Sequence, residues 1–229
     1  MKTVLCDARA DAVLARLDEE ARKQSVDMRR YYDAKRQEVK RTTDPDSPED
    51  MAFVRDKFVA LDAEKCDLCY MLCRSIKARR VVEFGTSFGV STIYLAAAVR
   101  DTVREDGGTG VVIGTEIEPT KARVATANLA DAGLDGFVDL RVGDARQTLK
   151  DAGGAVDFLL LDSWIPLVRP VMDVVAPQLR TGAIVVCDNV QIYEREYAAY
   201  TSFVREPRNG FRSVLLSHEG GLEISVKVS

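Results

Sequence analysis

From residue 81 onward, short apolar segments alternate with helical stretches, and this alternation limits the fold more than any other feature of the chain. The apolar segments are short enough for strands that are buried on both faces. They cover residues 81–84, 111–115, 138–142, 156–161 and 183–187. The helical stretches lie near 90–100, 119–132, 146–151, 167–180 and 194–206. Strands that alternate with helices form right-handed βαβ units on a parallel sheet, so we expect a doubly wound α/β fold.

The two ends of the chain follow other patterns. The segment FRSVLLSHEGGLEISVKV contains two alternating strands joined at Gly220–Gly221, which predicts an antiparallel hairpin. Residues 8–40 have the apolar spacing of one long helix. After the loop RTTDPDSPEDM, Ser47 and Pro48 have the residue types of a helix cap and first turn, and we expect this second helix to run to about residue 78. The chain thus divides into an N-terminal helical extension, 1–78, and a main domain, 79–229.

Composition excludes several classes of protein. The net charge is −4, with acids and bases mixed along all 229 residues, so we expect no nucleic-acid partner. No apolar run reaches the roughly 18 residues that a bilayer span needs, and the charged N-terminus is unlike a secretory signal. The five cysteines, an odd number, are typical of a reducing compartment, so we expect a cytoplasmic protein without a membrane anchor.

Three of these cysteines, Cys66, Cys69 and Cys73, have a spacing that also suggests a metal site. The same spacing places them on one stripe of a helix. A zinc site needs a fourth ligand, and the only histidine, His218, is distant in the sequence. We therefore expect buried structural cysteines.

The first strand runs into a glycine-rich turn, VVEFGTSFGVST, which is a candidate cofactor site. It lacks the three glycines of the dinucleotide fingerprint. Glu83, just before the turn, would repel a pyrophosphate but not a cation, which favours S-adenosylmethionine over NAD. Gly85 allows a close backbone approach, and the helix N-terminus offers N–H groups to the carboxylate of the ligand. The residues of this turn that we expect at the cofactor are Glu83, Gly85, Thr86, Ser87, Gly89 and Ser91.

The ends of the next two strands carry groups suited to the rest of such a cofactor. Glu116 ends the second strand, where its carboxylate can accept both ribose hydroxyls. Asp144 follows the third strand, where it suits the adenine amino group, with Ala145 beside it. The sequence therefore predicts a cationic nucleoside bound across three strand ends.

At this point the chain resembles the catechol and caffeoyl-CoA O-methyltransferase family, in its bacterial branch. The resemblance covers about residues 79–229 and is carried by VVEFGTSFGVST, GTEIEP, VGDA, FLLLDSW and IVVCDNV. It implies a Rossmann-like, seven-stranded sheet with an antiparallel last strand. It also implies that Trp164 packs near the adenine and that the acceptor is a small phenol or hydroxylated metabolite.

Three oxygen-bearing side chains at neighbouring strand ends indicate a cation site. Asp162 ends the fourth strand, and Asp188 and Asn189 end the fifth. Carboxylate and amide oxygens are the ligands that Mg²⁺ prefers, and in the resembled family these positions hold a divalent ion. Asp162 is thereby also the expected catalytic residue, acting through the metal. The family's general base, a lysine three residues after Asp162, is replaced here by Ile165.

Several alternatives stay open at this stage. The missing lysine also fits a metal-independent N- or O-methyltransferase or a binding protein without catalysis. An RNA methyltransferase is a further alternative; it predicts a basic face, for which the sequence shows only scattered clusters such as 77–80. The long N-terminal helix lies either across a homodimer or on its own sheet. Substitutes for the missing base are Tyr193, Glu194 and His218. Candidates for the lining of the acceptor pocket are Tyr31, Tyr32, Met51, Phe53 and Tyr193.

Overall fold

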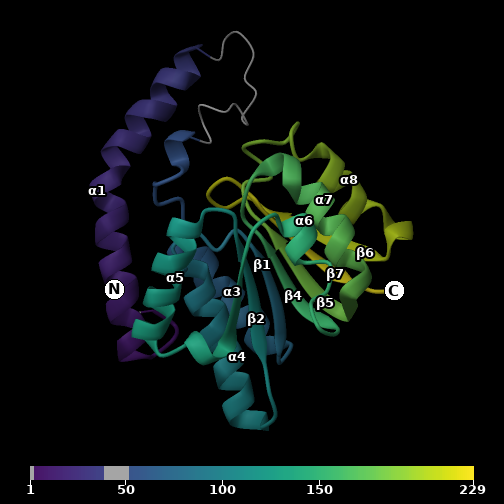
Figure 1. Cartoon of the computed structure of the whole chain (residues 1–229). Coiled ribbons are helices and arrows are strands. Elements are labelled where there is room, and N and C mark those ends of the chain that lie inside the picture. The colour runs from purple at the N-terminus through teal and green to yellow at the C-terminus, as the bar shows by residue number, and fades with distance from the viewer. Residues whose placement is uncertain (1–2, 39–51) are drawn as a thin grey trace.

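A seven-stranded sheet forms the centre of the molecule in the computed structural model, which describes residues 3–38 and 52–229 (Figure 1). The strand order is β3-β2-β1-β4-β5-β7-β6. The strands are β1 (Arg80–Phe84), β2 (Val111–Glu116), β3 (Val138–Val142), β4 (Val156–Leu161), β5 (Leu179–Cys187), β6 (Phe211–Leu216) and β7 (Leu222–Lys227). β1 to β5 pair in parallel, and β7 is antiparallel to both β5 and β6. The expected sheet with an antiparallel last strand is confirmed.

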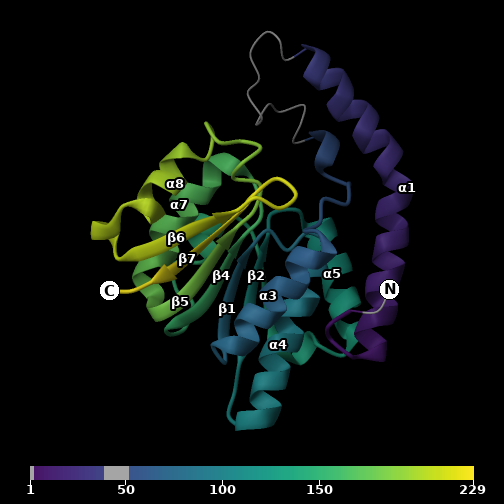
Figure 2. The same cartoon turned by 180° about the vertical axis from the view of Figure 1, so that it is seen from behind.

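Helices cover both faces of this sheet, as Figures 1 and 2 show. One face carries α3 (Ala63–Ser75), α4 (Val90–Asp106) and α5 (Pro119–Ala132), and α1 (Ala8–Glu38) packs outside α5. The other face carries α6 (Ala145–Thr148), α7 (Ile165–Val175) and α8 (Ala198–Arg205). The expected N-terminal helix is present and packs on its own chain.

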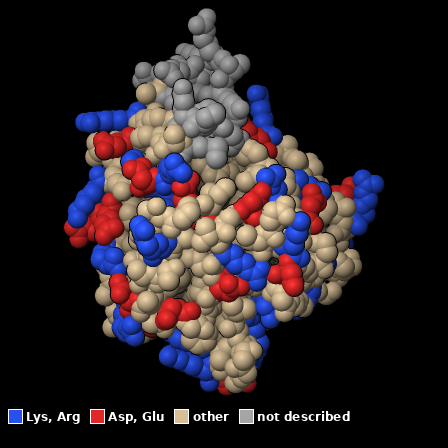
Figure 3. Space-filling view, in the orientation of Figure 1, with Lys and Arg blue, Asp and Glu red and all other residues tan. Residues whose placement is uncertain are grey.

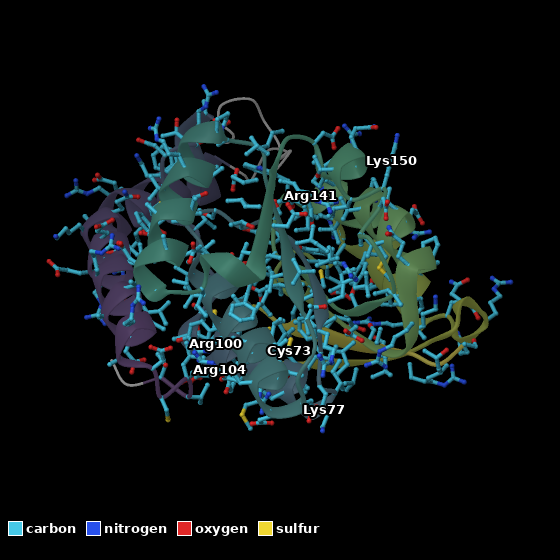
Figure 4. The ribbon with its side chains drawn as sticks, turned by 60° about the horizontal axis from the view of Figure 1, so that its bottom comes forward. Cys73, Lys77, Arg100, Arg104, Arg141 and Lys150 are labelled. Atoms are coloured by element: carbon cyan, nitrogen blue, oxygen red, sulfur yellow. The ribbon has the colours of Figure 1, made fainter. Side chains whose placement is uncertain are left out.

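Two hydrophobic cores result from this arrangement, one on each face of the sheet. Alternation along β1 places Val81 in the first core and Val82 in the second, and both side chains are fully buried. Cys66, Cys69 and Cys73 lie on α3 in the first core as free, buried thiols. Cys73 is seen inside the molecule in Figure 4. Burial raises the pKa of all three thiols, so they stay protonated and inert.

The second expected helix differs from the structure. Its cap, Ser47 and Pro48, lies outside the described residues. In the described part, a helical turn at 52–54 is followed by non-helical chain until α3 begins at Ala63, so a continuous helix to residue 78 is wrong. The helical bond from Phe58 N to Val54 O is replaced by two side-chain bonds. Gln24 accepts from Phe58 N at 2.9 Å, and Lys121 donates to Val54 O at 3.1 Å.

Two further expectations concern membrane-spanning helices and the division of the chain. None of the described helices has an apolar stretch long enough to cross a bilayer. The division of the chain at residue 78 stays a prediction.

Candidate functional site

Glu83 lies at the carboxyl end of β1, beneath the glycine turn, and is fully buried. Its carboxylate accepts hydrogen bonds from Thr86 Oγ1 at 2.7 Å, Ser91 Oγ at 2.6 Å and Thr92 Oγ1 at 2.6 Å. Burial raises the pKa of Glu83, and the three hydroxyl groups act in the opposite direction. Glu83 therefore shapes the turn, and its negative charge lies below the place where we expect the cofactor.

The two glycines of the turn have different physical roles. Gly85 has φ +107°, and a Cβ there would lie 2.0 Å from the carbonyl oxygen of Asp162. Only glycine lets the ends of β1 and β4 approach so closely. Gly89 has φ +90° and precedes α4, where it faces Ala125 of α5. Gly85 is thus needed for the close approach, and Gly89 for the left-handed backbone at the start of α4.

Ser87 provides an unsatisfied polar group in the turn. Its backbone N–H donates to Glu116 Oε2 at 2.8 Å, and its own φ is +50°. Its buried hydroxyl has no hydrogen-bond partner among the described residues. Buried hydroxyls without a partner are uncommon, so a polar ligand group at the start of α4 would complete this site.

The expected ribose and adenine residues lie on the same edge of the sheet but already have partners. Glu116 Oε1 accepts from Glu118 N at 2.8 Å, in addition to the bond from Ser87. Asp144 accepts from Arg146 Nη2 at 2.7 Å, and this side-chain bond lowers the pKa of Asp144. The Ala145 side chain is buried in the second core, so only its backbone is free to face a ligand.

A small cavity of about 10 Å³ lies over the turn. Its floor is formed by 85–88, Val90 and Ser91, and Asp162 also lines it. The roof is formed by 58–61, which belong to a stretch that we call the cap segment, residues 52–61. Phe58 stacks on Phe88 with ring centroids 4.0 Å apart, so the cap segment lies directly on the cofactor turn. Trp164, just before α7, is partly buried and does not line this cavity.

Asp162 is the one carboxylate among the described residues that line the cavity. No described side chain or backbone N–H donates a hydrogen bond to its carboxyl group, although its backbone N–H donates to Phe84 O at 3.0 Å. Burial, together with the charges of Asp188 and Glu83, raises the pKa of Asp162 to about 8. The carboxyl group thus lies in an excess of negative charge, which a cation would relieve.

Asp188 and Asn189 lie at the end of β5, and a lysine that the sequence interpretation missed lies beside them. Lys65 Nζ of α3 is 2.7 Å from Asp188 Oδ1 and 3.1 Å from a carboxylate oxygen of Asp62. Asn189 Nδ2 donates to Asp188 Oδ2 at 3.0 Å, and Asn189 has φ +63°. Burial raises the pKa of Asp188 despite the ion pair with Lys65.

One signal in the sequence indicates the buried lysine. Lys65 is four residues before Cys69 and eight before Cys73, so it shares the buried stripe of α3. A lysine at such a position is 2% exposed here and needs an anionic partner, which the sequence alone does not reveal.

The residues of this cluster fit a divalent cation. Asp62, Asp162 and Asp188 interact with one another electrostatically, and Lys65 is the one ammonium group that the described residues place among them. The available ligands are two carboxylates, Asp162 and Asp188, with the amide of Asn189. The described residues contain no group of three or more His, Cys, Asp or Glu side chains that would hold a metal, so waters would complete the coordination.

The other expected residues lie as follows. Tyr31 stacks on Phe53 with centroids 3.7 Å apart, which joins α1 to the cap segment. Met51 and the side chain of Tyr32 lie outside the described residues. Tyr193 packs against the second core, Glu194 is exposed, and His218 pairs with Glu64 at 3.1 Å on the surface. None of these three makes a hydrogen bond to Asp162, Asp188 or Asn189 through its side chain within the described chain.

The surface seen in Figure 3 carries blue and red side chains interspersed. Among the described residues, that face therefore shows no continuous basic patch of the kind that binds a phosphate backbone.

The comparisons with known proteins agree with this geometry. Residues 82–190 match the family model of a methyltransferase domain. The chain is 36% identical over 133 residues to a catechol O-methyltransferase of Mycobacterium tuberculosis, covering 58% of this chain and 57% of that protein. It thus spans little more than half the length of the curated relatives that it matches.

Solved structures extend the similarity over most of the chain. A cofactor-bound structure of Rv0187 from MTB has a TM-score of 0.66 and 26% identity, covering 86% of this chain and 95% of that one. The O-methyltransferase TomG from Streptomyces achromogenes, in complex with SAM, has a TM-score of 0.67 and 24% identity, covering 92% and 99%. Residues 82–190 thus match a methyltransferase domain, and the chain is similar to O-methyltransferases in sequence and in fold.

Proposed function

We propose that the protein transfers a methyl group from S-adenosylmethionine to a hydroxyl oxygen of a small phenolic or hydroxylated acceptor, with the help of a divalent cation such as magnesium. The observation that carries this proposal is the position of Asp162. Its carboxyl group lines the cavity over the glycine turn and interacts electrostatically with Asp188. A methyl donor in the turn and a cation at the two aspartates would therefore be neighbours.

The turn suits a cationic nucleoside in two ways. The unpartnered hydroxyl of Ser87 and the N-terminal end of α4 provide donors for the carboxylate of the ligand. The carboxylates of Glu83 and Glu116 provide negative charge near a sulfonium and acceptors near a ribose. Two of the similar solved structures contain a bound cofactor, which in one of them is SAM.

The reaction would be an in-line displacement at the methyl carbon. The acceptor hydroxyl would lose its proton to water, its oxygen would form the new C–O bond, and the C–S bond would break with its electron pair leaving on the neutral thioether. The protein's part is to hold the acceptor oxygen against the methyl group, and such positioning supplies up to roughly 7–11 kcal/mol in model reactions. A divalent cation, when bound, lowers the pKa of the acceptor hydroxyl. Asp162, Asp188 and Asn189 would hold it.

The experiment is a methyl-transfer screen against catechols, phenols and amines, with added Mg²⁺ or with EDTA. We expect transfer to catechols or phenols that EDTA abolishes. Asp162→Asn should lose at least 100-fold in kcat, since it removes one of two carboxylate ligands. Asp173→Asn serves as a matched control, because Asp173 pairs with Arg169 on the surface of α7. Full activity of Asp162→Asn would contradict the proposal.

A second candidate is a metal-independent methyltransferase. Ile165 stands where the family's lysine is expected, and the ammonium group of Lys65 already supplies one positive charge to the carboxylates. This candidate predicts methyl transfer that EDTA leaves unchanged, so the same screen separates the two.

The proposed partners of the protein are a small-molecule acceptor and a second copy of the chain. The acceptor is a small molecule that enters between the cap segment and the end of β5. A homodimer is the one protein partner that we propose, and size-exclusion chromatography with light scattering tests it.

A further inference from the structure

Lys65 is a buried side chain with three polar contacts that the proposed reaction does not use. Its ammonium group donates to Asp188 Oδ1 at 2.7 Å and to the backbone carbonyl of Glu219 at 2.6 Å. A third contact, of 3.1 Å, reaches Asp62. The three donors of the ammonium group thus have three acceptors.

These contacts join three parts of the chain. Asp62 lies at the junction of the cap segment with α3, Asp188 follows β5, and Glu219 lies in the turn between β6 and β7. Lys65 is the residue at which these parts meet, and its side chain is 1% exposed. A buried ion pair of this kind is directional, because the carboxylate cannot turn without losing it.

Hydrogen bonds hold both oxygens of the Asp188 carboxylate. Oδ1 accepts from Lys65, and Oδ2 accepts from Nδ2 of Asn189, the third expected ligand, at 3.0 Å, so a cation would bind through the remaining lone pair of Oδ2. In many metal sites, a neighbouring group binds the atom of a ligating side chain that does not contact the metal. This contact fixes the orientation of that side chain.

We propose that Lys65 is a positioning residue for the cation site: it holds Asp188 through Oδ1 so that Oδ2 and Asn189 face a divalent cation. This inference rests on the proposed function, because it assumes that the cation binds at these residues. Lys65 contributes no ligand atom itself.

The test is Mn²⁺ binding to the full chain without cofactor, followed by electron paramagnetic resonance of the free ion. This readout does not depend on turnover. We expect Lys65→Met to weaken Mn²⁺ binding about 10-fold or more, as the loss of such supporting groups does elsewhere. Lys65→Arg keeps the positive charge and should recover part of the affinity. Lys77→Met is the control, since Lys77 is an exposed lysine that pairs with Asp106 and lies two residues beyond the end of α3.

Circular dichroism establishes that each variant is folded, and Lys65→Gln, which keeps an N–H donor, carries the same test if Lys65→Met does not fold. Unchanged Mn²⁺ affinity in folded Lys65→Met would overturn the positioning role alone. Tighter binding would also overturn it, since Lys65 would then compete with the cation. A wild-type protein that binds no Mn²⁺ would overturn both this role and the proposed cation dependence.

Discussion

The carboxylate of Glu83 accepts hydrogen bonds from three hydroxyl groups and so forms a satisfied polar cluster next to the cavity. Thr86, Ser91 and Thr92 follow Glu83 by three, eight and nine residues, so one side chain fixes both the turn and the first turn of α4. A buried acceptor with three donors is stable only while all of them are present.

Glu83→Gln should therefore lower the free energy of unfolding by about 2 kcal/mol. The amide nitrogen of glutamine is a donor, so it cannot accept the hydroxyl hydrogen bonds that one carboxylate oxygen of Glu83 accepts. Urea denaturation measures the change, and calorimetry should show weaker binding of S-adenosylhomocysteine. Glu105→Gln is a suitable control, because Glu105 pairs with Arg74 at the surface. Equal stability of Glu83→Gln and Glu105→Gln would contradict this account.

A second residue-scale prediction concerns the start of α1. Partial burial opposes ionisation of Asp7, but its hydrogen bond from Arg100 and two backbone bonds hold the pKa below the ordinary value. The ion pair therefore stabilises the fold above the unfolded-state pKa, and its contribution is lost as the pH falls through the lower folded-state value. Asp7→Asn should cost about 1 kcal/mol at pH 7 and nothing at pH 2. Thermal unfolding at both pH values measures the difference, and a cost that persists at pH 2 would exclude the ion pair as its cause.

Among the elements, the cap segment is held to the rest of the protein by side-chain hydrogen bonds and an ion pair. Its backbone is held by Gln24 of α1 and Lys121 of α5, and Arg55 pairs with Glu118 at 2.8 Å. Burial lowers the pKa of Lys121, whose ammonium group also lies 5.3 Å from the Phe88 ring. The cavity beneath, at about 10 Å³, is far below the roughly 300 Å³ at which ligand pockets of drug-sized molecules begin. The cap segment must therefore shift for a nucleoside to enter.

Phe58→Ala should loosen this attachment by removing the stack on Phe88. We expect S-adenosylhomocysteine to dissociate about 10-fold faster, which corresponds to roughly 1.4 kcal/mol and to the value of one aromatic pair. Stopped-flow displacement measures the rate. Phe203→Ala is the control, because Phe203 packs against Phe211 away from the cap segment. The same rate in both variants would show that the stack does not hold the cap.

The elements differ in how far the sequence determines them. Apolar strands such as β4 were predictable to the residue, because burial on both faces demands continuous apolar runs. The break before α3 was not, since the groups that replace the helical bond of Val54 and Phe58 come from α1 and α5. The same limit applies to the site. Strand-end residues such as Asp162 and Asp188 follow from topology, whereas the pairing of Lys65 with Asp188 joins residues 123 positions apart.

On the scale of the whole molecule, the proposed cofactor would contact two segments that are separate in the sequence, the turn after β1 and the cap segment. The turn after β1 and the cap segment face each other across the cavity, so a ligand there adds contacts that only the folded chain offers. Binding of this kind stabilises a protein by mass action.

S-adenosylhomocysteine at 100 times its Kd should therefore add about 2.7 kcal/mol to the free energy of unfolding. For a chain of this size the increase in Tm should be several degrees, at about 2–4 °C per kcal/mol. Differential scanning calorimetry measures it. NAD at the same concentration should leave Tm unchanged, because Glu83 and Glu116 disfavour a pyrophosphate, and an equal shift with NAD would contradict the assignment of the turn.

The stack of Phe58 on Phe88 has a consequence for steady-state kinetics. If one segment both covers the nucleoside and borders the acceptor's entrance, the two substrates cannot exchange independently. The methyl donor must load before the acceptor, and the demethylated nucleoside must be released last. S-adenosylhomocysteine should then inhibit competitively against S-adenosylmethionine, whereas the methylated acceptor should inhibit non-competitively against both substrates.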